Sequence, residues 1–262
     1  MLAWRWAVID EAPSGDVAER PQPPAQARRH GWVEQYDPRW VKLLTALFTP
    51  IFRYWIRYYR WFNVEKIPPT GGMFLVCNHT TAMDPFLVGF SMRHRVFRGP
   101  GRVELFKYRV PAYIMRKIGM FPLRQRVADA AAVRTIFELI RGEQMVLVFP
   151  EGGRSRDGRL QPMIPGFVRL ALKLKVPLVP MAIAGGTDLM PMGKVIPKRN
   201  TPVAAVYGDP FDLAEFYGRP ITDELVEEAA RVIYDRMAEQ LERARAERAR
   251  IAEENGIRLP AR

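Results

Sequence analysis

The sequence predicts an α/β fold, in which a mixed, largely parallel sheet is flanked by helices. From residue 73 to residue 207, short apolar runs typical of buried strands alternate with longer amphipathic segments typical of helices. Of the 262 residues, 48% are hydrophobic, which is ample for the core of one main domain with appendages. The chain has no internal repeat.

Apolar runs mark the expected strands, at residues 73–77, 95–97, 119–123, 145–149, 178–184 and 202–207. Helices are expected at residues 85–92, 110–118, 130–141, 166–174 and 222–250. Their ends carry capping residues: Asp84 ahead of Pro85, Asp129 and Gly142 around the third helix, and Thr222 before the last. Residues 64–262 are therefore expected to form the main domain.

Residues 1–38 are expected to be a flexible N-terminal segment, because prolines are scattered there among charged and small residues. The apolar run in the first ten residues is too short for a secretory signal, and Arg5 interrupts it. No stretch of the chain approaches the roughly 20 apolar residues that a membrane-spanning helix needs.

Residues 39–63 are dense in aromatic side chains and are expected to form a helix or helical hairpin at a membrane interface. The apolar run between Lys42 and Arg53 is ten residues long. As a helix it would be about 15 Å long, half the thickness of a bilayer core. Helical spacing places its cations on one stripe. The expected interface residues are Lys42, Arg53, Arg57, Arg60, Trp55 and Trp61. A core helix of a soluble domain is the alternative.

The formal net charge of +12 predicts attraction to polyanions: nucleic acid, an anionic membrane or a phosphorylated substrate. Against nucleic acid, the sequence has no helix-turn-helix, zinc-finger or RNP-type signature. The single cysteine, Cys77, excludes an intrachain disulfide and a multi-cysteine metal site, and it fits a cytosolic location.

The first candidate for chemistry is His79, which directly follows the expected strand 73–77, with Asp84 five positions later. A tight turn can return the carboxylate to the imidazole, so that the histidine acts as a general base toward a hydroxyl. The alternative is structural: Asp84 is then only a helix cap and His79 only a loop residue. One carboxylate can also do both, because it has two oxygens.

The second candidate is the turn after the strand 145–149. There Glu151, Gly152 and Gly153 precede Arg154 and Ser155, which offer donors suited to a phosphate. The pattern lacks the GxxxxGK[ST] signature of a P-loop, and a solvated turn is the alternative. A weaker third patch places Arg124 and Arg126 after the strand 119–123.

In this order, the segments resemble the conserved blocks of the glycerolipid acyltransferase family. Asn78, His79 and Asp84 match its Asn-His-x4-Asp block, residues 149–155 match Phe-Pro-Glu-Gly-Thr-Arg-Ser, and residues 176–180 match Val-Pro-x-x-Pro. Arg102 and Glu104 resemble a Lys-x-Glu-Leu element that precedes the family's second block, Gly-x-x-Phe/Pro-x-x-Arg, which begins here at Gly119. The likeness spans roughly residues 64–208. Two positions depart from it: Gly153 replaces threonine, and Gln125 stands where the second block has arginine.

The resemblance implies the glycerolipid acyltransferase fold and transfer of a fatty acyl group from acyl-CoA or acyl carrier protein to 1-acylglycerol-3-phosphate. His79 would be the base and Asp84 its orienting partner. The acceptor would be held by Glu151, Gly152, Arg154 and Ser155, with Arg124 or Arg126, and supported by Asn78, Arg102 and Glu104. No cofactor or metal is implied. The partners implied are a lysolipid and a membrane surface, with the enzyme peripheral or monotopic on the cytoplasmic face.

Other readings stay open at this point. Within the same family the acceptor can be glycerol 3-phosphate, a phosphoinositol mannoside or a lyso-ornithine lipid. Outside enzymes, the chain can be a basic module that binds a membrane or nucleic acid and carries a vestigial site.

Overall fold

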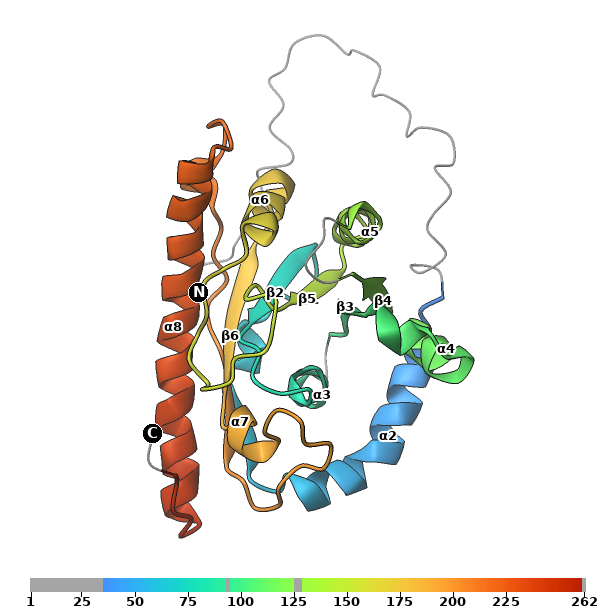
Figure 1. The fold of residues 1–262 in the computed structure, drawn as a ribbon, viewed down its shortest axis with the longest axis vertical. Helices are drawn as coiled ribbons and strands as arrows, with labels where there is room; N and C mark the ends of the chain where they lie inside the picture. Colours follow the sequence, from blue (N-terminus) through green and yellow to red (C-terminus); the bar gives the residue numbers. More distant parts are fainter. Residues whose placement is uncertain (1–34, 93–94, 125–128, 261–262) are drawn as a thin grey trace.

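The computed structural model describes residues 35–92, 95–124 and 129–260, and these contain a seven-stranded sheet in the order β1-β7-β6-β2-β5-β3-β4 (Figure 1). The strands are β1 Tyr59–Phe62, β2 Met73–Cys77, β3 Phe97–Arg102, β4 Met120–Leu123, β5 Met145–Val148, β6 Leu178–Ala184 and β7 Val203–Tyr207. All neighbouring strands run parallel except β6 and β7. The predicted mixed, largely parallel sheet is confirmed.

Helices follow most strands, as the alternating pattern predicts. They are α2 Pro38–Trp55, α3 Asp84–Ser91, α4 Arg109–Lys117, α5 Ala130–Arg141, α6 Pro165–Leu174, α7 Gly186–Leu189 and α8 Asp223–Glu254, with short 3-10 turns η1 Val64–Lys66, η2 Val103–Phe106 and η3 Ala214–Phe216. Three predicted caps are present. The Asp129 carboxylate accepts the N–H groups of Ala131 and Ala132, the Thr222 hydroxyl accepts that of Leu225, and Gly142 is the C-cap of α5.

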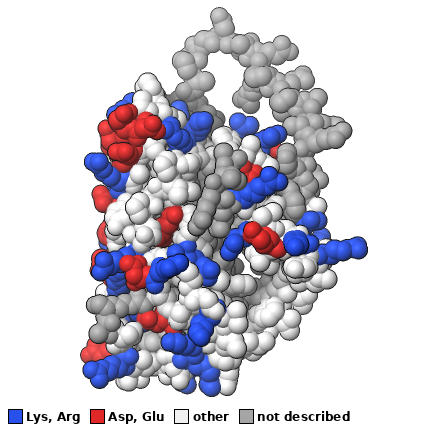
Figure 2. Space-filling view, in the orientation of Figure 1, with Lys and Arg blue, Asp and Glu red and all other residues white. Residues whose placement is uncertain are grey.

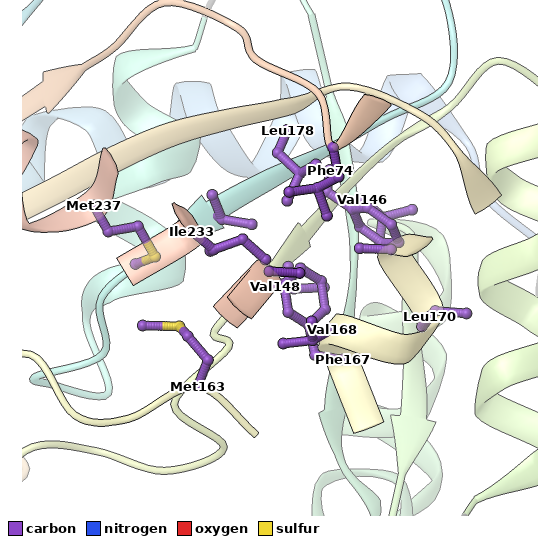
Figure 3. Close-up of a cluster of buried hydrophobic side chains, with 14 of the residues drawn as sticks. Phe74, Val146, Val148, Met163, Phe167, Val168, Leu170, Leu178, Ile233 and Met237 are labelled. Carbon is purple, nitrogen blue, oxygen red and sulfur yellow. The ribbon is translucent and has the colours of Figure 1, made fainter. Parts of the chain in front are cut away.

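The two faces of the sheet are buried by different helices. On one face, Phe74 and Val76 of β2 lie in a hydrophobic cluster formed with residues of α5, α6 and α8 (Figure 3). On the other face, Leu75 and Cys77 pack with residues of α3 and with the end of α2. Because side chains alternate along a strand, a fully buried strand between two helical layers must be apolar at every position, as β2 is.

The predicted helix over residues 39–63 is wrong in its second half. The helix α2 ends at Trp55, and Tyr59–Phe62 instead forms the edge strand β1, parallel to β7. Burial of Tyr59, whose hydroxyl donates to the Leu87 carbonyl at 2.7 Å, favours the strand. The sheet therefore begins before residue 64, the predicted start of the main domain.

This boundary removes several residues from the predicted cationic stripe. Arg57 follows the helix, and Arg60 lies in β1 with an ion pair to Glu254 at 2.6 Å. Trp55 and Trp61 are half-buried and pack against the core on the α3 side of the sheet. Lys42 and Arg53 remain on α2, which has no buried residue.

In the described part of the chain, no helix combines the length and the apolar character needed to cross a membrane. Of the predicted flexible segment 1–38, residues 1–34 lie outside the described residues.

Candidate active site

The site lies where β2, β5 and β6 end side by side. These three strands are neighbours and run parallel, so the residues that follow them meet at one edge of the sheet. Asn78, directly after β2, extends the ladder with its side chain: its amide accepts the Ile183 N–H at 2.7 Å and donates to the Ile183 carbonyl at 3.0 Å. The predicted supporting residue Asn78 thus anchors the end of β2 to β6.

His79 and Asp84 form the predicted pair, with Nδ1 of His79 2.9 Å from Oδ2 of Asp84. The same Oδ2 accepts the backbone N–H groups of Thr80 at 2.6 Å and Thr81 at 2.9 Å. Asp84 is fully buried, and Oδ2 is the acceptor for both of these N–H groups. An oxygen that accepts from amides here also accepts from the ring, so Nδ1 of His79 carries the proton and Nε2 is left as the basic atom.

The imidazole is further fixed by Phe149, which follows β5. The two rings stack with centroids 4.0 Å apart and planes 18° from parallel. The His79 side chain is 18% exposed, so one part of it stays open to a ligand while Asp84 is sealed away. A partly shielded imidazole held by a buried carboxylate has the geometry of a general base.

The predicted helix-capping role of Asp84 is wrong. Asp84 is the first residue of α3, whose N-cap is Met83, and the orphan N–H groups of Phe86 and Leu87 bind the Met83 carbonyl. The Asp84 carboxylate instead turns back to the N–H groups of the preceding turn. The tight turn after His79 requires these bonds, because it buries Thr80 and Thr81 beside the sheet.

The turn after β5 holds the main chain of His79 from both sides. Oε1 of Glu151 accepts the His79 N–H at 2.7 Å, and the Ser155 N–H donates to the His79 carbonyl at 2.7 Å. The other Glu151 oxygen accepts the Gln161 N–H at 2.9 Å. Burial raises the pKa of Glu151 to about 7, against the lowering effect of these two N–H donors.

These contacts give Glu151 and Ser155 a structural role within the protein. Both Glu151 oxygens are occupied by main-chain donors, and the Ser155 hydroxyl donates to Asp157 at 2.9 Å. These side chains therefore position the turn, and their predicted contact with the acceptor stays a prediction. Composition alone did not distinguish the two roles, because the partners are main-chain groups distant in sequence.

Gly152 and Arg154 follow Glu151 in this turn. Gly152 has φ +69°, and a Cβ there would come within 2.9 Å of the Ile164 side chain. Gly153 stands where the family block has threonine, and there is open space around it. Arg154 is half-buried, and no hydrogen bond or ion pair within the described residues engages its guanidinium. Its guanidinium therefore has no carboxylate partner in the described part of the chain.

The other predicted ligand-binding residues lie farther along the sheet. Arg124 is exposed just after β4, and its backbone N–H donates to the Asp129 carboxylate at 3.0 Å. Arg126 lies outside the described residues. Arg102 and Glu104 form an exposed ion pair at 3.4 Å. Glu104 also borders a cavity of about 440 Å³ between η2, α4 and β4.

Thr80, Thr81 and Gly186 belong to the site but were missed by sequence reasoning. A Cβ on Gly186, in α7, would lie 2.2 Å from the Thr80 hydroxyl and 3.3 Å from Oδ1 of Asp84. The signal was the glycine pair directly after β6, which is typical of a close approach of main chain. No cluster of three or more metal-ligating His, Cys, Asp or Glu side chains occurs in residues 35–92, 95–124 and 129–260.

Comparison with known proteins shows what this site is similar to. The sequence model of the acyltransferase family matches residues 60–184, which include His79, Asp84 and the Glu151 turn. A Bacillus subtilis protein named 1-acyl-sn-glycerol-3-phosphate acyltransferase is 26% identical over 63% of this chain and 79% of its own. A Streptococcus pneumoniae protein of the same name is 27% identical over 64% of this chain and 60% of its own. The chain covers only 44% of the coconut protein of that name, at 29% identity.

Among solved structures, the 1-acyl-sn-glycerophosphate acyltransferase PlsC from Thermotoga maritima matches with a TM-score of 0.60. The match covers 76% of this chain and 78% of the Thermotoga maritima chain at 24% sequence identity. It therefore supports the fold alone. The His79–Asp84 pair and the Glu151 turn lie inside the region that the family model matches, and over this region the chain is similar to the acyltransferase family.

Proposed function

We propose that this acyltransferase transfers a fatty acyl group from a thioester to the free hydroxyl of 1-acylglycerol-3-phosphate, giving phosphatidic acid for phospholipid synthesis. The observation that carries the proposal is the 2.9 Å contact between Nδ1 of His79 and the buried Asp84 carboxylate, which leaves Nε2 of His79 as the base. The names of the bacterial relatives support the acceptor.

In the proposed reaction, Nε2 of His79 removes the proton of the acceptor hydroxyl as its oxygen attacks the thioester carbonyl carbon. The carbon–sulfur bond then breaks, and the departing thiolate takes the proton back from the imidazolium. Asp84 stabilises the imidazolium formed between the two steps. The reaction yields an ester and a thiol, and the enzyme returns to its starting protonation state.

The acceptor phosphate is assigned to Arg154. A guanidinium presents paired N–H donors that match phosphate oxygens, and in the described structure this one has no competing carboxylate. Arg124 and Arg126 stay candidates for a second contact. Next to Arg154, Gly153 has open space around its Cα, which leaves room for a ligand beside the guanidinium.

The test is acyl transfer by the purified full chain, with labelled acyl-CoA and acyl carrier protein each offered to a panel of acceptors. The panel contains 1-acylglycerol-3-phosphate, glycerol 3-phosphate, a phosphoinositol mannoside and a lyso-ornithine lipid. We expect labelled phosphatidic acid from wild type and none from His79→Ala, with matching circular dichroism spectra. A preference for another acceptor would replace the assignment within the family, and turnover by His79→Ala would overturn the general base.

A further inference from the structure

The loop of residues 190–200, between α7 and β7, exposes apolar side chains at its tip. Val195 is 88% exposed and Ile196 is 65% exposed, and Val195 is the most exposed large apolar side chain among the described residues. Met192 in the same loop is 42% exposed. Single exposed apolar residues are common on protein surfaces, but several in one loop mark a surface for an apolar partner.

The charge of this loop has one sign. Lys194, Lys198 and Arg199 flank Val195 and Ile196 in the sequence, and no acidic residue occurs between Asp188 and Asp209. An apolar tip ringed by cations matches an anionic lipid surface, where the tip enters the acyl boundary while the cations meet headgroups.

The loop is continuous with the exposed side of α2. The Arg199 guanidinium lies 4.1 Å from the centroid of the Tyr54 ring near the end of α2, and Figure 1 shows the loop and this end of α2 side by side. The exposed apolar residues of α2 recur at helical spacing: Leu43, Leu47, Phe48, Ile51 and Tyr54. In Figure 2 the lower right edge, over α2, is white, whereas blue side chains gather near the middle and lower left.

The loop is also attached directly to the active-site turn. The Thr81 hydroxyl donates to the Met190 carbonyl at 3.1 Å, and the Lys198 N–H donates to the Leu189 carbonyl at 2.6 Å, which closes the loop onto α7. α7 itself is held by an ion pair between Asp188 and Arg248 of α8. Because Thr81 also donates its N–H to Asp84, the loop and the His79–Asp84 pair share one rigid support.

We propose that the 190–200 loop is a second membrane-binding element, which docks with α2 on an anionic lipid surface and sets the His79 site against it. The inference depends on the proposed function in one respect: the acceptor is a lipid that reaches the enzyme from the bilayer. A rigid link between the docking loop and the catalytic turn would fix the depth of the site, so that a lysolipid reaches His79 without leaving the membrane.

The loop can be tested with a fluorophore, because the single natural cysteine, Cys77, is fully buried. Ile196→Cys is labelled with an environment-sensitive dye, and Tyr234→Cys on α8 is the matched control. With phosphatidylglycerol-containing vesicles we expect a blue shift and a severalfold increase in emission at position 196 and little change at position 234. No change at position 196 in protein that co-sediments with the vesicles would overturn the proposal.

Variants separate this proposal from the proposed function. Val195→Ser with Ile196→Ser should weaken vesicle binding by about tenfold or more, while turnover of a short-chain, monomeric acceptor stays near wild type. If wild type acylates no acceptor but the dye still inserts, the proposed function fails and the docking loop stands. Unchanged vesicle binding by the loop variant overturns the loop. The loop proposal is also overturned if the dye at position 196 responds to acyl carrier protein, or to a rise in protein concentration, when no vesicles are present.

Discussion

The Glu151 carboxylate holds the main chain of His79, with Oε1 of Glu151 2.7 Å from the His79 nitrogen. The two residues are 72 positions apart, at the ends of the neighbouring parallel strands β2 and β5. Together with the Ser155 bond to the His79 carbonyl, this contact fixes both peptide groups of the base. The two blocks of sequence therefore work as one unit, in which the second holds the first in place for proton transfer.

Glu151→Gln should lower kcat more than it changes KM for the acceptor. Glutamine keeps one accepting oxygen, so its amide nitrogen would face one of the two N–H groups, of His79 or Gln161, that the carboxylate now accepts. A looser His79 costs on the order of 10- to 100-fold in kcat. Steady-state kinetics with both substrates measure this, with Glu239→Gln on α8 as an exposed control. A large rise in acceptor KM at constant kcat would instead make Glu151 a ligand-binding group.

The raised pKa of Glu151 predicts a pH-dependent loss of stability. In the unfolded chain this carboxyl titrates near its ordinary value of 4.5, whereas in the folded protein it titrates at about 7. Between pH 4.5 and about 7 the folded state binds more protons than the unfolded state. The free energy of unfolding therefore falls as pH rises through this range, by up to about 3 kcal/mol. Urea unfolding of wild type and Glu151→Gln at pH 4.5, 6 and 7.5 tests this. A constant difference between the two proteins would contradict it.

The sheet could be predicted because its central strands are buried on both faces, which forces continuous apolar runs such as Met73–Cys77. The His79–Asp84 pair could be predicted because a strand end and five residues of spacing define it locally. The role of Glu151 could not, because its partners are main-chain N–H groups brought close only by strand pairing. The strand Tyr59–Phe62 was missed because an aromatic run with arginine suits an interfacial helix and an edge strand equally.

Asp84→Asn should damage both activity and stability. Oδ2 of Asp84 accepts from His79, Thr80 and Thr81, and an amide nitrogen in its place would leave buried donors without an acceptor. We expect kcat to fall on the order of 10³- to 10⁴-fold and the free energy of unfolding to fall by about 1–3 kcal/mol. Pre-steady-state kinetics and urea unfolding measure the two effects. Near-normal kcat in a destabilised variant would show that His79 does not depend on this carboxylate.

Charge reversal on α2 should weaken binding to anionic vesicles, and β1 offers a matched control. Arg53 and Lys42 lie on the helix without a buried residue, whereas Arg60 is paired with Glu254 at the sheet edge. Each reversed cation near the surface is worth about 1 kcal/mol or more. Co-sedimentation should therefore show a clear loss for Lys42→Glu with Arg53→Glu and a small one for Arg60→Glu. Equal losses would mean that net charge alone attracts the protein.

Arg154→Ala should raise KM for the acceptor by tens of fold and change KM for the thioester by less than about twofold. The reason is its position: Arg154 follows the turn that holds His79, with no ion pair among the described residues to compete for its guanidinium. A charged donor to a phosphate contributes about 1.5–3 kcal/mol, which corresponds to such a change in KM.

Arg159→Ala is the control for this prediction. Arg159 lies on the same segment, but its side chain is 82% exposed and faces Asp157 at 3.8 Å. An exposed cation beside a carboxylate contributes little to binding a ligand at the strand ends. Both kinetic constants should therefore stay near wild type in this variant, and Arg154→Lys should recover only part of the loss because an ammonium cannot form the paired contact. If Arg154→Ala raises the thioester KM instead, the guanidinium serves the acyl donor, and the acceptor phosphate must be assigned to the arginines after β4.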